Sequence, residues 1–194
     1  MPWAPGWQGG SLEHNATMDE IVKQALLKWP NVPACYGWLG LDNRGRWYLR
    51  DDATQAQGAF PAIKGSWLQH EKLIEFIHRN YESDALGQWY FQNGPQRVYV
   101  ELESTPWIWR VDRQGGIASH TGQPAGDVLG CWQDEQGKVY LHAALGWGLV
   151  HSMDVHQLAE LMDAKGWEAQ PIASQELPGR GGYVQSPCAS HPQA

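Results

Sequence analysis

The stretch from Tyr36 to Arg50 has the pattern of a strand, a tight turn and a second strand. Aromatic and aliphatic residues, among them Trp38 and Trp47, lie on both sides of the tetrapeptide Asp42-Asn-Arg-Gly45. Such residues favour strands. Asp at the start of a turn accepts local backbone N–H groups, and Gly at its end adopts positive φ without steric cost. The sequence therefore predicts a β-hairpin here.

The same pattern recurs downstream around three further turns, Gln92-Asn-Gly-Pro95, Asp112-Arg-Gln-Gly115 and Asp134-Glu-Gln-Gly137. Strands joined by such short turns pair antiparallel, because parallel neighbours need long crossover connections. We therefore expect an α+β fold whose antiparallel sheet is built of hairpins.

Apolar residues at helical spacing predict about three amphipathic helices that cover one face of this sheet. The first follows a Thr-x-x-Glu capping box at Thr17, and the second runs from about Ser66 to a stop near Gly87. The third begins near Asp154 and ends at Lys165-Gly166, the usual order of residues at a helix C-terminus.

The chain is predicted to consist of a flexible arm (1–16), one globular domain (17–172) and a disordered tail (173–194) that folding does not need. Pro, Gly, Ser and Gln dominate the tail, with almost no apolar periodicity. Met18 is an alternative translation start to Met1.

An internal duplication is one interpretation of the repeated hairpins. Asp42 and Tyr48 align with Asp134 and Tyr140 at an offset of 92 residues. This alignment suggests two modules of hairpin, loop, helix and strand, at residues 32–102 and 128–172. The alternative is that turn chemistry alone places Asp-x-x-Gly wherever hairpins form.

Charge and hydropathy argue against nucleic acid and membranes as partners. The formal net charge is -7, with 14 Lys and Arg against 21 Asp and Glu, so no basic surface is expected for nucleic acid. No apolar run is long enough for a membrane span, and the N-terminus lacks a secretory pattern, so we expect a cytoplasmic protein. Cys35, Cys131 and Cys188 form no Cys-x-x-Cys pair, which predicts free thiols rather than a disulfide framework or zinc site.

No nucleotide-binding loop, serine nucleophile elbow or zinc-peptidase helix is present in the sequence. The catalytic candidates are His142, His151 and Asp154, with Tyr140 or His142 as acid or base. Imidazole and carboxylate ligands at these spacings can in principle hold a transition metal. Against this, Asp154 lies where a helix cap is expected, and as an N-cap it is explained without a metal. We expect neither a metal nor a cofactor.

Twelve tryptophans are the outlier of the composition. Trp107 and Trp109 are two apart on one predicted strand, so they project from one face, and Trp38 and Trp47 are placed to lie across a hairpin. Together with Tyr140, these four are the candidate ligand-binding residues, since indole faces stack on sugars, peptides or planar ligands. The alternative is that the same indoles pack in the core.

The run from Met18 to Asp52, which includes Lys28-Trp-Pro-Asn-Val-Pro-Ala-Cys-Tyr-Gly-Trp38, resembles an uncharacterised bacterial family of unknown function. The resemblance extends to about residue 172 and implies a bacterial cytoplasmic protein, but it carries no activity or cofactor. The sequence thus favours a non-enzymatic module that binds a protein or small ligand through an aromatic sheet face or cleft. A small enzyme using residues 142–156 and a structural homodimer paired through a sheet edge are the alternatives.

Overall fold

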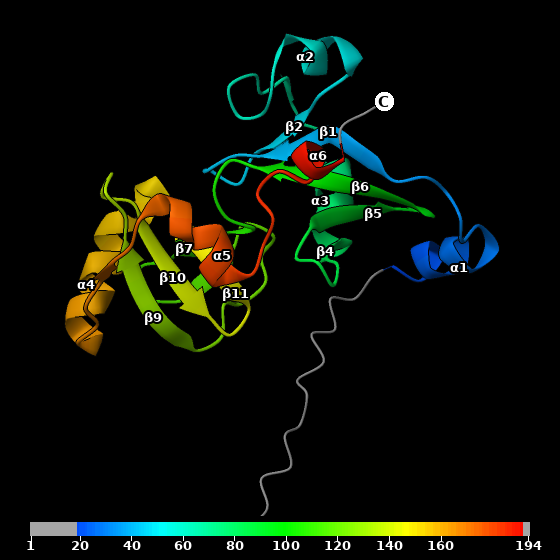
Figure 1. The fold of residues 1–194 in the computed structure, drawn as a ribbon. Helices are drawn as coiled ribbons and strands as arrows, with labels where there is room; N and C mark the ends of the chain where they lie inside the picture. The colour runs from blue at the N-terminus through cyan, green and yellow to red at the C-terminus, as the bar shows by residue number, and fades with distance from the viewer. Residues whose placement is uncertain (1–18, 192–194) are drawn as a thin grey trace, which may run out of the picture.

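The computed structural model describes residues 19–191, which form two six-stranded sheets with helices packed beside them (Figure 1). The first sheet has the spatial order β3 (Ser66–Trp67), β2 (Trp47–Leu49), β1 (Cys35–Leu41), β6 (Gln96–Leu102), β5 (Trp89–Asn93), β4 (Tyr81–Ser83). The second has the order β12 (Gln170–Pro171), β9 (Val128–Gln133), β10 (Val139–Ala143), β11 (Gly146–Val150), β7 (Trp107–Val111), β8 (Ile117–Ser119). Most pairs are antiparallel, and the α+β class is confirmed.

The predicted turns are confirmed, and one further turn was not foreseen. Oδ1 of Asp42 accepts the N–H groups of Arg44 and Arg46 at 2.8 and 2.9 Å, which closes the β1–β2 hairpin. Asp112 and Asp134 hold their turns in the same way. So does Asp84, between β4 and β5, in a segment that the sequence assigned to the end of a helix. The Asp side chain at each turn thus satisfies two backbone donors locally.

The two sheets repeat one topology. In each, a hairpin strand lies parallel to the last strand of a three-strand meander: β1 pairs with β6, and β7 with β11. The register is also repeated, since Leu39 lies opposite Val100 in the first sheet and Trp109 lies opposite Val150 in the second. The Asp42 turn therefore corresponds to the Asp112 turn. The predicted alignment with Asp134 is matched only loosely. The Tyr48 and Tyr140 hydroxyls each donate to Oδ2 of the Asp in their own turn, but β9 is the first strand of its meander, whereas β1 lies outside the meander and pairs with its last strand.

Six α-helices lie in the described residues: α1 (Glu20–Lys28), α2 (Asp52–Gln57), α3 (Glu71–Arg79), α4 (Val155–Lys165), α5 (Leu177–Gly181) and α6 (Pro187–Ser190). The first and third predicted helices are confirmed as α1 and α4, and α4 ends at Gly166 in the left-handed conformation. The predicted arm and the Thr17 cap lie outside the described residues. No helix within residues 19–191 is both long enough and apolar enough to cross a membrane.

The second predicted helix is much shorter than expected. Ser66 and Trp67 form β3, and α3 begins only after His70, whose Nδ1 accepts the N–H of Leu73 at 3.3 Å. At 1.5 Å per residue, the nine residues of α3 are about 13 Å long. This helix cannot cover the whole face of the first sheet on which it packs.

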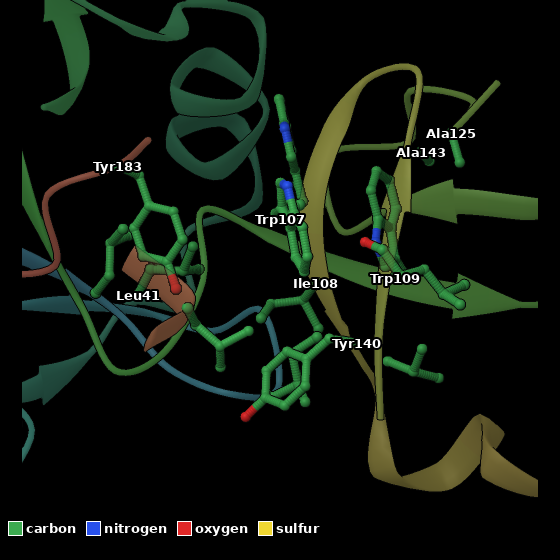
Figure 2. Packing of buried hydrophobic residues seen from close by; sticks show 14 of the residues in the cluster. Leu41, Trp107, Ile108, Trp109, Ala125, Tyr140, Ala143 and Tyr183 are labelled. Carbon is green, nitrogen blue, oxygen red and sulfur yellow. The ribbon is translucent and has the colours of Figure 1, made fainter. Parts of the chain in front are cut away.

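The core between and within the sheets is rich in indoles (Figure 2). Trp107 and Trp109 project from β7 with ring centroids 6.4 Å apart, and Trp109 crosses β11 to donate its indole N–H to the carbonyl of Leu141 at 3.0 Å. A Cβ on Gly148 of β11 would collide with the Trp109 ring and with the carbonyl of Trp107. Glycine in β11 thus leaves room for the indole to lie across the strand.

The segment after residue 173 is folded, so the predicted disordered tail is wrong for residues 174–191. It runs from α5 beside the second sheet to α6 beside β6 of the first (Figure 1). Leu177 and Tyr183 are buried, and the carbonyl of Gln185 accepts the N–H of Leu102 at 2.8 Å. A few well-placed apolar side chains anchor this segment, which its composition did not indicate.

All three cysteines are free thiols. Cys131 is buried, and Cys35 and Cys188 are half-buried. Cys188 lies within α6 and its backbone N–H donates to Glu101, so it does not lie in the disordered tail that the sequence predicts.

Candidate functional site

The predicted histidine and aspartate group does not form one site. Nδ1 of His151 accepts the N–H of Met153 at 3.1 Å, ahead of α4. The Asp154 carboxylate accepts hydrogen bonds from the Arg110 guanidinium at 2.6 and 3.2 Å and from the Val111 N–H at 3.1 Å. These bonds fasten the start of α4 to β7, which is a structural role.

His142 lies apart from His151 and Asp154. It sits opposite Trp147 on the neighbouring strand, with its ring stacked 4.9 Å from that indole, while His151 lies beyond the far end of β11. Burial lowers the pKa of His142, and burial together with the Arg110 charge lowers that of His151. Within the described part of the chain, no three His, Cys, Asp or Glu side chains are grouped so that they could hold a metal ion.

Three of the four tryptophans expected to form a binding face are core residues. Trp47, Trp107 and Trp109 are at most 3 % exposed, and each indole N–H has a partner: Nε2 of His78 for Trp47, and the carbonyls of Leu145 and Leu141 for the other two. Trp47 lies opposite Leu41 in the β1–β2 register, not opposite Trp38. The alternative interpretation, packing in the core, holds for these three.

Trp38 is different, because it is 39 % exposed and lines an apolar groove of about 530 Å³. The groove lies between α3 and the face of the first sheet that this short helix leaves uncovered. Its apolar walls come from β1, β2, β5, β6 and α3: Leu39, Leu49, Phe91, Val98, Leu73 and Ile77. Leu49 is also unusually exposed for a leucine on a sheet that faces a helix.

The polar groups at the groove are few, and the charged ones are already engaged. Arg50 is buried and donates to the carbonyls of Gly37, Gly58 and Ile63. The Asp51 carboxylate caps α2 by accepting from Thr54. The neutral hydrogen-bonding groups in the lining are Asn93, the Cys35 thiol and Gln96, whose side-chain amide donates to the carbonyl of Pro33 at 3.0 Å.

The sequence identifies Trp38 but not the other walls of this groove. A helix running from Ser66 to near Gly87, as the sequence predicts, is longer than α3, which begins only at Glu71. The signal that was available is the capping potential of His70, which places the helix start later.

Tyr140 is not part of this groove. Its hydroxyl donates to Oδ2 of Asp134 at 2.9 Å, and it lines a separate polar cavity near the C-terminal segment.

A family model described as "Protein of unknown function (DUF2946)" matches residues 18–188. No curated protein matches the chain. A crystal structure of a DUF1285 family protein from Silicibacter pomeroyi DSS-3 is similar with a TM-score of 0.46 and 14 % sequence identity. That match covers 70 % of this chain and 75 % of the other.

Proposed function

The chain belongs to the family described as "Protein of unknown function (DUF2946)", and we propose that it binds a small, uncharged, mostly apolar molecule in the groove between α3 and the first sheet. The observation that carries this proposal is the open apolar groove itself. Its volume of about 530 Å³ lies within the range of small-molecule sites, which are mainly apolar with a few polar groups.

The chemistry of the walls supports an uncharged ligand. Since Arg50 and Asp51 have their hydrogen bonds within the protein, neither is available to pair with a charged ligand group. Burying an unpaired charge against Leu49, Phe91 and Val98 would be costly. An apolar body with one hydroxyl or carbonyl end, directed to Asn93 or Gln96, suits this lining.

Trp38 supplies an indole next to the bound molecule. It differs from Trp67, which is 50 % exposed, belongs to the edge strand β3 and is absent from the groove lining. The two residues therefore form a matched pair for a test: same side chain, similar exposure, different place.

The test is binding of Nile red, an uncharged apolar dye, followed by its displacement with 1-decanol. We expect saturable binding to one site, weakened about tenfold by Trp38→Ala, which removes apolar contact area. Leu49→Asp should abolish binding, because it places a charge in the apolar wall. Trp67→Ala should bind the dye like the unmodified protein.

Circular dichroism and thermal unfolding of each variant establish that the fold is intact. The proposal is refuted if Trp38→Ala and Leu49→Asp bind the dye normally, or if Trp67→Ala weakens binding as much as Trp38→Ala does. Failure of 1-decanol to displace the dye would also count against a ligand with an apolar body and a hydroxyl end.

A further inference from the structure

A second cavity, polar and about 210 Å³ in volume, lies where the β9–β10 turn, the segment joining the two sheets and the C-terminal segment meet. Its lining is almost entirely hydrogen-bonding side chains. The residues are Glu103, Ser104, Asp134, Gln136, Lys138, Tyr140, Ser174, Gln175, Leu177, Tyr183 and Gln185. The C-terminal segment contributes the last five, so the cavity exists only because that segment is folded against the sheets.

Tyr183 is the unusual member of this lining. It is 5 % exposed, yet its buried hydroxyl has no hydrogen-bond partner among the residues that the structure describes. Leaving a buried hydroxyl unpaired costs about 1–3 kcal/mol. Burial, reinforced by the neighbouring Tyr140, raises the pKa of Tyr183, so the hydroxyl keeps its proton and can donate.

Tyr140 shows the contrast. Figure 2 places its ring, on β10, in the same packed region as Tyr183 on the C-terminal segment. The Tyr140 hydroxyl is satisfied by Asp134, whereas that of Tyr183 has only the cavity beside it. A bound molecule that accepts from Tyr183 would remove the cost of the unpaired hydroxyl.

The charges around the cavity are balanced. Lys64 pairs with Oε2 of Glu103 at 2.7 Å, and both oxygens of Asp134 are occupied, by the Tyr140 hydroxyl and by the N–H groups of Gln136 and Lys138. In residues 19–191, the Lys138 ammonium forms no ion pair within 4 Å, and the side-chain amides of Gln136 and Gln175 make no hydrogen bond. The wall thus offers several donors and acceptors but little net charge.

A hydroxyl group both donates and accepts hydrogen bonds, so a molecule with several hydroxyls matches a wall that offers both donors and acceptors. A net anion would face Glu103 and Asp134, and a net cation would face Lys138. We propose that this cavity binds a small, uncharged, polyhydroxylated molecule whose hydroxyls pair with Tyr183, Lys138 and the two glutamine amides.

Isothermal titration calorimetry and thermal unfolding of the full chain test the proposal with four probes. D-glucose and myo-inositol are uncharged polyols, sodium acetate is an anion, and glycine is a zwitterion. We expect one or both polyols to bind saturably and to raise the unfolding temperature, while acetate and glycine do neither.

Tyr183→Phe separates a ligand contact from a structural contact. Without ligand, it should unfold at the same or a higher temperature, because it removes an unpaired hydroxyl. With a polyol, it should bind about tenfold more weakly. Tyr90→Phe is the matched control: it removes a hydroxyl that donates to Glu82 outside the cavity, and polyol binding should be unchanged.

Four results would overturn the proposal. The first three are no binding of either polyol, tighter binding of acetate or glycine, and unchanged polyol binding by Tyr183→Phe. The fourth is equal weakening of polyol binding in Tyr90→Phe, which would exclude this cavity as the site. The groove variant Leu49→Asp should bind polyols normally, so the two sites can succeed or fail independently.

Discussion

The indole N–H of Trp47 donates a 3.0 Å hydrogen bond to Nε2 of His78, and the two rings lie 6.1 Å apart. This contact joins the first hairpin to α3 and requires His78 to be neutral, because a protonated imidazole cannot accept the bond. Burial accordingly lowers the pKa of His78 from 6.5 to about 4.

Stability should therefore fall as the solution is acidified. The unfolded chain binds a proton at this histidine below about pH 6.5, while the folded chain does so only near pH 4. The stabilisation is complete above pH 6.5 and is lost as pH falls toward 4, by up to roughly 3 kcal/mol at 1.4 kcal/mol per pKa unit. Urea unfolding across this range measures it.

His78→Gln keeps an acceptor for the Trp47 indole but does not titrate, so it should reduce the pH dependence. Burial, with a smaller effect from His78, also lowers the pKa of His120. Protonation of His120 in acid therefore also destabilises the folded chain, and this contribution remains in the His78→Gln variant. If the unfolding free energy of His78→Gln depended on pH as strongly as that of the unmodified protein, His78 would not be the group responsible.

Gly148→Ala should destabilise the second sheet. The new methyl group would meet the Trp109 indole and the Trp107 carbonyl, and crowding of this kind in a core costs about 1–3 kcal/mol. Gly179→Ala, where nothing lies within 4 Å of the added carbon, should change the free energy of unfolding by less than about 1 kcal/mol. Equal effects would mean that the indole does not need the glycine.

Asp154→Ala should cost about 2 kcal/mol, chiefly because the buried N–H of Val111 loses its acceptor. Burial opposes ionisation of Asp154, but hydrogen bonds from Arg110 and Val111 outweigh it and lower its pKa. Its stabilisation is thus present above the ordinary Asp pKa and lost in stronger acid.

Removing the exposed partner of His156 by Glu160→Ala should have little effect on unfolding, since exposed pairs contribute little. Denaturant titration of both variants decides this. If Asp154→Ala left the free energy of unfolding unchanged, the structural role given to that residue would be contradicted.

Leu177→Ala tests whether the C-terminal segment is part of the core. Leu177 is 2 % exposed, and truncating a buried leucine costs about 2–5 kcal/mol. Leu129→Ala, at a leucine that is 62 % exposed, should change stability by less than about 0.5 kcal/mol. If the two variants were equally stable, the segment after residue 173 would be dispensable.

Local chemistry made the hairpins predictable. Asp42, Asp112 and Asp134 each act within five residues of chain, so their turns follow from the sequence alone. The partner of each hairpin did not follow, because β1 and β6 meet only in the folded sheet. Similar turn sequences suggested Asp134 as the counterpart of Asp42, whereas the topology selects Asp112.

The candidate sites depended on contacts that no local pattern contains. Trp107 lies in the core because the two sheets pack together around it and because the Leu145 carbonyl accepts its indole N–H. The groove at Trp38 depends on where α3 begins, and the polar cavity on a segment whose composition indicated disorder. Tyr140 was singled out from the sequence, but its neighbour Tyr183 was not.

The C-terminal segment has a consequence for how the chain is made. Several contacts join this segment to the first sheet and its loops. The Leu102 N–H donates to the Gln185 carbonyl, Gln88 and Val184 form a β-bridge, and the Cys188 N–H donates to the Glu101 carboxylate. These partners emerge from the ribosome roughly a hundred residues after the strands of the first sheet, at synthesis rates of about 5–20 residues per second. For several seconds after its strands are made, the first sheet therefore lacks these contacts, and it gains them only when the last residues of the segment are released.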